Sequence, residues 1–156
     1  MPALRKSTAQ SNCVAYKLAW VRDRIRLPSG IAAALLKQAR KNPGEECCGL
    51  LAGCHGAITR AFPAINTAPQ PTTAYEIAPE ELFGLMRQIR TAALEFLGIY
   101  HSHPGAENVP SATDVDRAYY PDVAYFIVSP RLDAQRPIRA FSIRDGVASE
   151  FEIQIV

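Results

Sequence analysis

The chain has 156 residues, of which 48% are hydrophobic and 21% charged, and its formal net charge is +2. This composition is ordinary for one soluble globular domain, and the charge is too small to indicate nucleic acid or an anionic membrane as a partner. No apolar run approaches the roughly 18 residues of a membrane span, and the polar N-terminus lacks the apolar middle of a signal peptide. We therefore predict a cytoplasmic domain over residues 16–156, preceded by a disordered or appended leader over residues 1–15.

Hydrophobic periodicity divides this domain into alternating strands and helices. In chain order the patterns predict a strand over 16–26, a helix over 28–40, strands over 45–53 and 57–65, a loop over 66–73, a short strand over 75–77, a helix from Pro79 to about Ala93, a strand over 96–100, a short helix over 112–120, and strands over 123–128, 138–144 and 147–156. Two of the boundaries have strong signals, because Asn42-Pro43-Gly44 ends a helix and Asp145-Gly146 is typical of a hairpin turn. This order predicts a mixed sheet flanked by two long helices, in an α/β or α+β arrangement.

A pair of histidines follows the strand predicted over residues 96–100. On an extended backbone, side chains two residues apart point to the same side, so His101 and His103 project together. Pro104 ends the strand, and a loop rich in glycine, asparagine and proline leads to Ser111 and Asp114. That loop is long enough to bring the Asp114 carboxylate beside the two imidazoles. Two histidines and one carboxylate leave a fourth tetrahedral position open for water, which is typical of a catalytic zinc.

Simpler interpretations of these residues stay open at this point. The two histidines could lie at a solvated strand end, and Ser111-x-x-Asp114 is also the pattern of a helix N-cap with an acid in the first turn. The capping role does not exclude metal ligation. Among the other acids, Glu107 lies in the flexible part of the loop and Asp116 points roughly 200° away from Asp114 around a helix. Asp114 is therefore the preferred third ligand.

The four cysteines do not form the disulfide framework of a small secreted domain. Three of them, with a neighbouring histidine, are candidates for a second metal site: Cys47, Cys48, Cys54 and His55. However, adjacent residues on a strand point to opposite faces, so Cys47 and Cys48 cannot hold one ion together. We therefore predict that these cysteines are buried structural thiols.

Two segments taken together resemble the JAMM (MPN+) zinc metallopeptidase family. The first is Glu46-Cys47-Cys48-Gly49-Leu50-Leu51-Ala52-Gly53, which is similar to the family pattern E-x-C-G-L-L-x-G. The second is His101-x-His103-Pro104 with Ser111-x-x-Asp114, which is similar to H-x-H-P followed by S-x-x-D at the family spacing. The resemblance covers about residues 16–156. It implies a deaminase-like MPN fold, in which a mixed, curved β-sheet is flanked by helices.

The resemblance also implies a role for each matching residue. His101, His103 and Asp114 would bind one Zn²⁺ per chain, with water as the fourth ligand. Glu46 would be the general base, which takes a proton from that water and gives it to the leaving amine, and Ser111 would donate a hydrogen bond to the developing oxyanion. From the residues alone Glu45 competes with Glu46, but strand alternation sends it to the other face and the family spacing selects Glu46.

The compact chain has no histidine or cysteine after His103, so it lacks the extra zinc site of some deubiquitinating members. It looks more like the short bacterial members, such as the cysteine-releasing peptidase, that act on ubiquitin-like sulfur-carrier proteins. This likeness implies a β-grasp carrier with a C-terminal Gly-Gly as the partner, with hydrolysis of the amide bond that follows it. Two alternatives are a zinc amidase or deaminase for a small molecule, and a non-catalytic scaffold. The scaffold is disfavoured because every ligand, the base and the serine are present. A homodimer is compatible with the sequence.

Overall fold

The computed structural model describes residues 24–156, and the predictions for the leader and for most of the first strand lie outside the described residues. In this part of the chain, eight strands form one mixed sheet in the order β7-β6-β5-β4-β2-β3-β1-β8. The strands are β1 (Ile25–Leu27), β2 (Cys48–Cys54), β3 (Ala57–Ala64), β4 (Glu95–Ser102), β5 (Ala124–Val128), β6 (Ile138–Arg144), β7 (Val147–Phe151) and β8 (Ile153–Ile155). The helices are α1 (Ser29–Lys41), α2 (Pro79–Thr91) and α3 (Ala112–Asp116).

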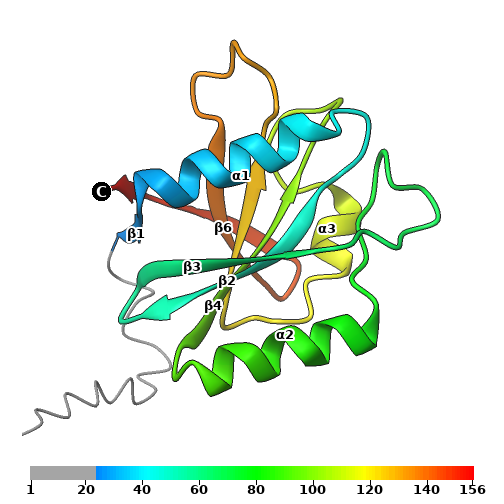
Figure 1. Cartoon of the computed structure of the whole chain (residues 1–156). Coiled ribbons are helices and arrows are strands. Elements are labelled where there is room, and N and C mark those ends of the chain that lie inside the picture. Colours follow the sequence, from blue (N-terminus) through cyan, green and yellow to red (C-terminus); the bar gives the residue numbers. More distant parts are fainter. Residues whose placement is uncertain (1–23) are drawn as a thin grey trace, which may run out of the picture.

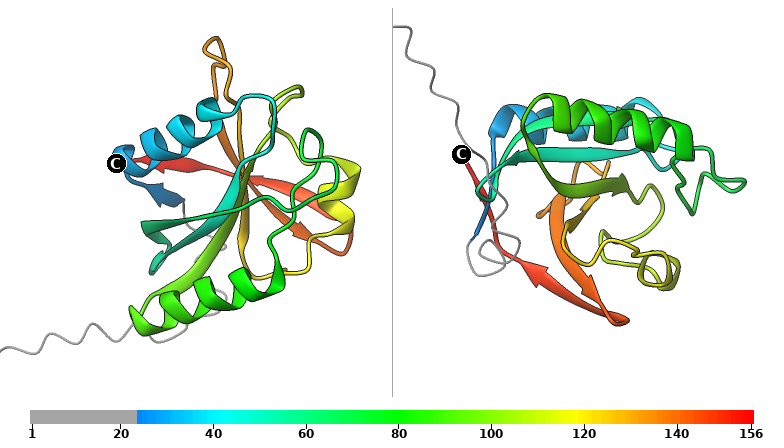
Figure 2. Two further views of the ribbon diagram at one scale, coloured as in Figure 1. Left: turned by 45° about the vertical axis from the view of Figure 1, so that its right-hand side comes forward. Right: turned by 90° about the horizontal axis from the view of Figure 1, so that it is seen from below.

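The two long helices cover opposite faces of the sheet, as Figures 1 and 2 show. Each central strand supplies both cores, because successive side chains of a strand point to opposite faces. In β5, Phe126 packs in the core under α1, whereas Tyr125 and Ile127 pack in the core under α2. The α1 core also contains Leu35 and Ala39, and the α2 core contains Leu85 and Ile89. The prediction of a mixed sheet between two long helices is therefore confirmed.

Some predicted boundaries were wrong. No strand forms over residues 75–77. The Glu76 amide donates to the Asn66 side chain, and the Glu76 carbonyl accepts from the amide and the hydroxyl of Thr67. The helix predicted over 112–120 ends at Asp116, and Ala93 lies beyond α2 in an exposed turn with φ 55°. The strand predicted over 147–156 divides into β7 and β8, which lie at opposite edges of the sheet. The hairpin at Asp145-Gly146 is confirmed, with φ of 50° and 74°.

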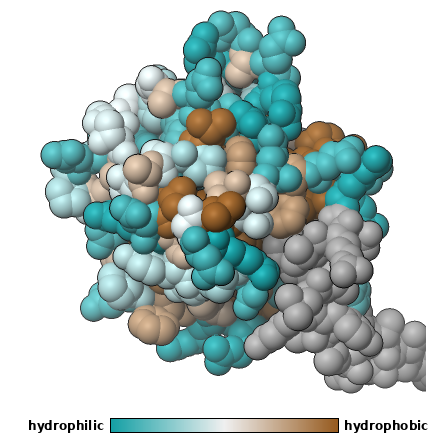
Figure 3. All heavy atoms as spheres, turned by 180° about the vertical axis from the view of Figure 1, so that it is seen from behind, coloured by the Kyte–Doolittle hydropathy of each residue, from teal (hydrophilic) through white to brown (hydrophobic). Residues whose placement is uncertain are grey.

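The strand β8 pairs in parallel with β1 at one edge, so the last residues of the chain lie beside the first described ones. Figure 3 shows the molecule from behind the view of Figure 1. The face seen there is mostly hydrophilic, with a few apolar residues near its centre. Among residues 24–156, no helix is long and apolar enough to cross a membrane.

Candidate metal and catalytic site

The register between β2 and β4 brings the two sequence motifs together. The strands are antiparallel, and Cys48 lies opposite His101. Cys47 and Ser102 continue this register beyond β2, because the Cys47 amide donates to Ser102 Oγ (2.8 Å) and the Ser102 amide donates to the Cys47 carbonyl (3.0 Å). Glu46 precedes Cys47 and His103 follows Ser102, and the charge of His103 acts on the pKa of Glu46. The predicted general base and a predicted ligand are therefore neighbours.

Three side chains, from β4, the residue that follows it and α3, converge on one point. His101 Nε2 lies 3.0 Å from His103 Nε2, and Asp114 Oδ2 lies 3.2 Å from the first and 3.1 Å from the second. Both histidines are buried. The structure thus brings together the three residues that the sequence analysis selected, and they form a group that could hold a metal ion.

A hydrogen bond sets the tautomer of the His103 ring, so that its Nε2 atom can bind a metal ion. His103 Nδ1 lies 2.7 Å from the Glu107 carbonyl oxygen, which can only accept, so Nδ1 carries a proton. In the neutral ring, Nε2 is then the unprotonated atom, and it faces Asp114. This carbonyl contact, and not a carboxylate contact, is the role of Glu107 in the site.

The donor set fits zinc in both chemistry and spacing. Zinc–ligand bonds of about 2.0–2.1 Å in a tetrahedron place neighbouring ligand atoms about 3.3 Å apart. The three distances of 3.0–3.2 Å are close to this value. Burial lowers the pKa of His101 and so favours its neutral, ligating form. Burial alone would raise the pKa of Asp114, but its interactions with His101 and His103 hold it well below its ordinary value, so the carboxylate is ionised.

A capping box fixes Asp114 at the start of α3. Ser111 Oγ accepts a hydrogen bond from the Asp114 amide (3.1 Å), and the Ser111 amide donates to Asp114 Oδ2 (2.8 Å). The same Oδ2 atom faces the two histidines. The N-cap and ligand interpretations of this segment are therefore compatible, because the cap orients the carboxylate toward the centre.

Glu46 is buried close to the three converging side chains, and its Oε2 atom has no hydrogen-bond partner among the described residues. Burial raises the pKa of Glu46 to about 7. The nearby charge of His103 lowers this pKa, and that of Asp114 raises it. A carboxyl group whose pKa lies near neutrality suits proton transfer. In contrast, Glu45 is exposed and accepts a hydrogen bond from Asn42. Burial therefore separates the two adjacent acids.

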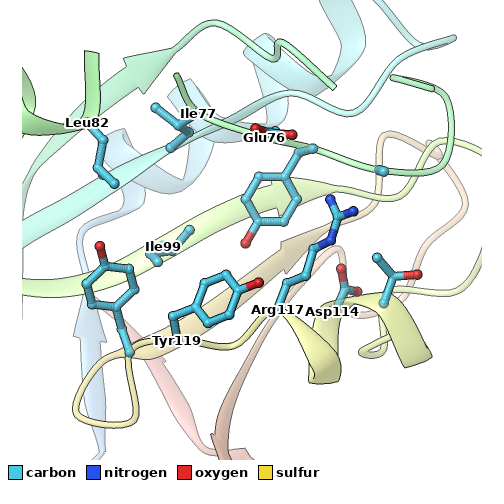
Figure 4. A pocket seen from close by; sticks show the side chains of 11 residues that line it. Glu76, Ile77, Leu82, Ile99, Asp114, Arg117 and Tyr119 are labelled. Atoms are coloured by element: carbon cyan, nitrogen blue, oxygen red, sulfur yellow. The ribbon is translucent and has the colours of Figure 1, made fainter. Parts of the chain in front are cut away.

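A pocket of about 430 Å³ opens beside Asp114 (Figure 4). Asp114 and Arg117 enter it from the α3 segment, and Glu76 and Ile77 come from the segment before α2. The rest of its wall is mainly apolar or aromatic: Ala74, Tyr75, Leu82, Ile99, Thr113, Tyr119 and Tyr120. No local sequence pattern predicts this pocket, because its lining comes from a loop, a helix and a strand that are distant in the chain.

The second candidate metal cluster is different in character. Cys54 and His55, at the end of β2 and in the β2–β3 turn, lie near Glu95 at the start of β4. However, Cys54 is disulfide-bonded, so it offers no thiolate, and the prediction that it is a buried thiol is wrong. Cys47 and Cys48 are free, with Cys48 buried and Cys47 partly buried, as expected for structural thiols. Cys13 lies outside the described residues.

Two residues near the centre were missed by the sequence analysis. Tyr75 stacks on His101, with ring centroids 4.4 Å apart and an interplanar angle of 21°. Asn66 binds the backbone on both sides of Tyr75 and also the carbonyl of Glu46. The available signal was weak, since a single tyrosine and a single asparagine in a polar stretch do not indicate a site.

Comparison with known proteins places these features in a family. Residues 28–144 match the family of prokaryotic homologs of the JAB domain. A desampylase of Haloferax volcanii is 41% identical over 114 residues, which cover 69% of this chain and 82% of that protein. A CysO-cysteine peptidase of Mycobacterium bovis is 34% identical over 125 residues, which cover 79% of this chain and 85% of that protein.

A solved structure agrees with the fold. The protein DSY2949 of Desulfitobacterium hafniense superposes with a TM-score of 0.72 at 28% identity, over 84% of this chain and 92% of that one. The chain therefore belongs to the prokaryotic homologs of the JAB domain, and with its relatives it is an enzyme of the peptidase class.

Proposed function

We propose that the protein is a zinc-dependent peptidase that cleaves the amide bond after the C-terminal Gly-Gly of a ubiquitin-like sulfur-carrier protein. The observation that carries this proposal is the convergence of His101, His103 and Asp114 within 3.2 Å, with the buried Glu46 alongside. Relatives named desampylase and CysO-cysteine peptidase, at 41% and 34% identity, support this class of substrate.

Each residue of the site has a separate task in this reaction. His101, His103 and Asp114 would hold the zinc, which when bound would polarise the scissile carbonyl and lower the pKa of a coordinated water to about 7. Glu46 accepts a proton from the attacking water and passes it to the departing amine. The Ser111 hydroxyl, whose oxygen already accepts from the Asp114 amide, keeps its own proton to donate to the developing oxyanion.

The burial of the three metal ligands favours a substrate whose C-terminal tail has no side chains. His101 is 1% and His103 5% exposed, and the side chain of Asp114 is 8% exposed. A chain end that approaches three such recessed ligands has little room for a Cβ atom. Two glycines meet this requirement, and the folded body of the carrier would supply binding energy away from the centre.

The substrate prediction uses a carrier joined to an amino acid through its C-terminal Gly-Gly. The zinc-loaded enzyme should release the amino acid, detected by intact mass, whereas a carrier with its last glycine changed to valine should bind but resist cleavage. A free hexapeptide with the same tail should have a substantially lower kcat/KM, because the carrier body is absent.

Equal cleavage of the glycine and valine tails, or of the hexapeptide and the whole carrier, would contradict this substrate class. It would instead favour a zinc amidase for a small molecule. The pocket beside Asp114 is the observation that keeps this second candidate, because about 430 Å³ is within the range of small-molecule sites.

Ser111 is expected to serve both stability and catalysis. Ser111→Ala should lower kcat about 10²–10³-fold through loss of an oxyanion donor. It should also lower the free energy of unfolding by about 1 kcal/mol through loss of the N-cap. Steady-state kinetics and thermal unfolding measure the two effects. Ser111→Gly is the matched control, because glycine caps a helix nearly as well. If Ser111→Gly regained activity together with stability, the catalytic role would be dropped.

A further inference from the structure

The two histidines of the centre are supported in different ways. His103 Nδ1 has the Glu107 carbonyl at 2.7 Å, the usual arrangement for a metal-binding histidine, whose second nitrogen donates to an acceptor. His101 Nδ1 is buried and has no hydrogen-bond partner among residues 24–156. Within the described part of the chain, the His101 ring therefore lacks the hydrogen bond that normally sets the orientation of such a ligand.

The Tyr75 ring occupies the position from which this orientation can be held. It is stacked on the His101 ring, 4.4 Å away and inclined by 21°. The His103 ring lies 4.9 Å from the His101 ring at 58°. Because His101 has an aromatic ring on one side and the second imidazole near it, rotation of its ring would force a clash with Tyr75. Packing can thus replace the missing hydrogen bond.

The loop that carries Tyr75 is itself held firmly by Asn66. The Asn66 amide nitrogen donates to the carbonyls of Glu46 (3.0 Å) and Ala74 (2.9 Å). Its amide oxygen accepts from the backbone N–H groups of Ala68 (2.9 Å) and Glu76 (3.0 Å). All four hydrogen bonds of the side chain are therefore used. Two of them flank Tyr75 directly, and a third ties the same loop to Glu46.

We propose that Tyr75 is a positioning residue for the metal centre. By stacking on the His101 ring, and not through a hydrogen bond, Tyr75 keeps His101 Nε2 directed at the metal. The proposal rests on the proposed zinc site and extends it to a residue that touches neither the metal nor the reacting atoms. It is the ring that acts, so phenylalanine should replace Tyr75 without loss, whereas alanine should leave the His101 ring free to turn.

The test measures zinc affinity by competition with a chromophoric chelator in wild type, Tyr75→Ala, Tyr75→Leu and Tyr75→Phe. Loss of an outer support of a metal-bound histidine typically lowers metal affinity 10–100-fold. We expect a decrease of about this size in Tyr75→Ala and an affinity near wild type in Tyr75→Phe. Tyr75→Leu keeps the apolar bulk if the alanine variant does not fold, and it should also bind zinc more weakly because it offers no flat ring.

Tyr119→Ala is the matched control, because Tyr119 lines the same pocket, is 75% exposed and has no ring contact with His101. It should bind zinc as wild type does. The visible spectrum of the cobalt-substituted protein gives a second readout, in which the Tyr75→Ala and Tyr75→Leu bands should shift and the Tyr75→Phe bands should not.

Two outcomes would overturn the positioning role: wild-type zinc affinity in both Tyr75→Ala and Tyr75→Leu, or an equal loss in Tyr75→Phe, which would assign the effect to the hydroxyl. A wild-type protein that binds no zinc would instead overturn the metal site itself. Failure of this inference is therefore distinguishable from failure of the proposed function.

Discussion

Glu46→Gln is expected to abolish most turnover while it leaves the fold and the zinc content unchanged. The substitution keeps the size of the side chain but removes its ability to accept a proton. Glu46 is buried beside the converging ligands and its pKa is raised to about 7 by burial, as suits a general base. General acid–base catalysis typically contributes about 10²–10⁴-fold, so kcat should fall by this factor. Steady-state kinetics, zinc analysis and thermal unfolding check the three parts of this prediction.

The adjacent acid provides the control. Glu45 is exposed, and among residues 24–156 its side chain accepts a hydrogen bond from Asn42 alone, so Glu45→Gln should be nearly silent. If Glu45→Gln were inactive and Glu46→Gln active, the wrong acid would have been chosen. If Glu46→Gln also lost zinc, Glu46 would have to be reconsidered as a ligand.

The second large effect is expected in His103→Ala, which should reduce zinc from about one ion per chain to a small fraction. His103 supplies one of three protein donors, and its loss leaves only two, too few for a site of the catalytic type. Elemental analysis of protein dialysed against metal-free buffer measures this change. His103→Ala is a cleaner test than Asp114→Ala, because Asp114 also accepts the capping hydrogen bond from the Ser111 amide.

The third histidine of the chain serves as the control for this experiment. His55 lies in the β2–β3 turn with φ 51°, a conformation that asparagine tolerates well, so His55→Asn should keep both fold and zinc. Full zinc content in a variant that lacks His101, His103 and Asp114 together would disprove the site. Loss of zinc in His55→Asn would show that zinc retention also depends on His55.

Local patterns in the sequence predicted the main elements and selected the residues of the candidate site. The apolar run over residues 123–128 predicted β5, and the Asp145-Gly146 pair predicted the β6–β7 hairpin. Both predictions succeeded because each pattern depends only on residues that are neighbours in the sequence. The pair His101 and His103 also depends only on strand geometry. Boundaries were less reliable at the short helix α3, which ends at Asp116, although Ala118 and Tyr120 beyond it pack against the core.

The sequence by itself thus determined the kind of donor and the elements that carry the donors, since strand alternation and N-cap chemistry are local. Only the tertiary structure decided which groups meet. The β2–β4 register brings Glu46 to His103, burial distinguishes Glu46 from Glu45, and the loop held by Asn66 places Tyr75 on His101. These contacts join residues that are 26 to 57 positions apart in the chain. They depend on strand register and on packing between layers, which no local pattern encodes.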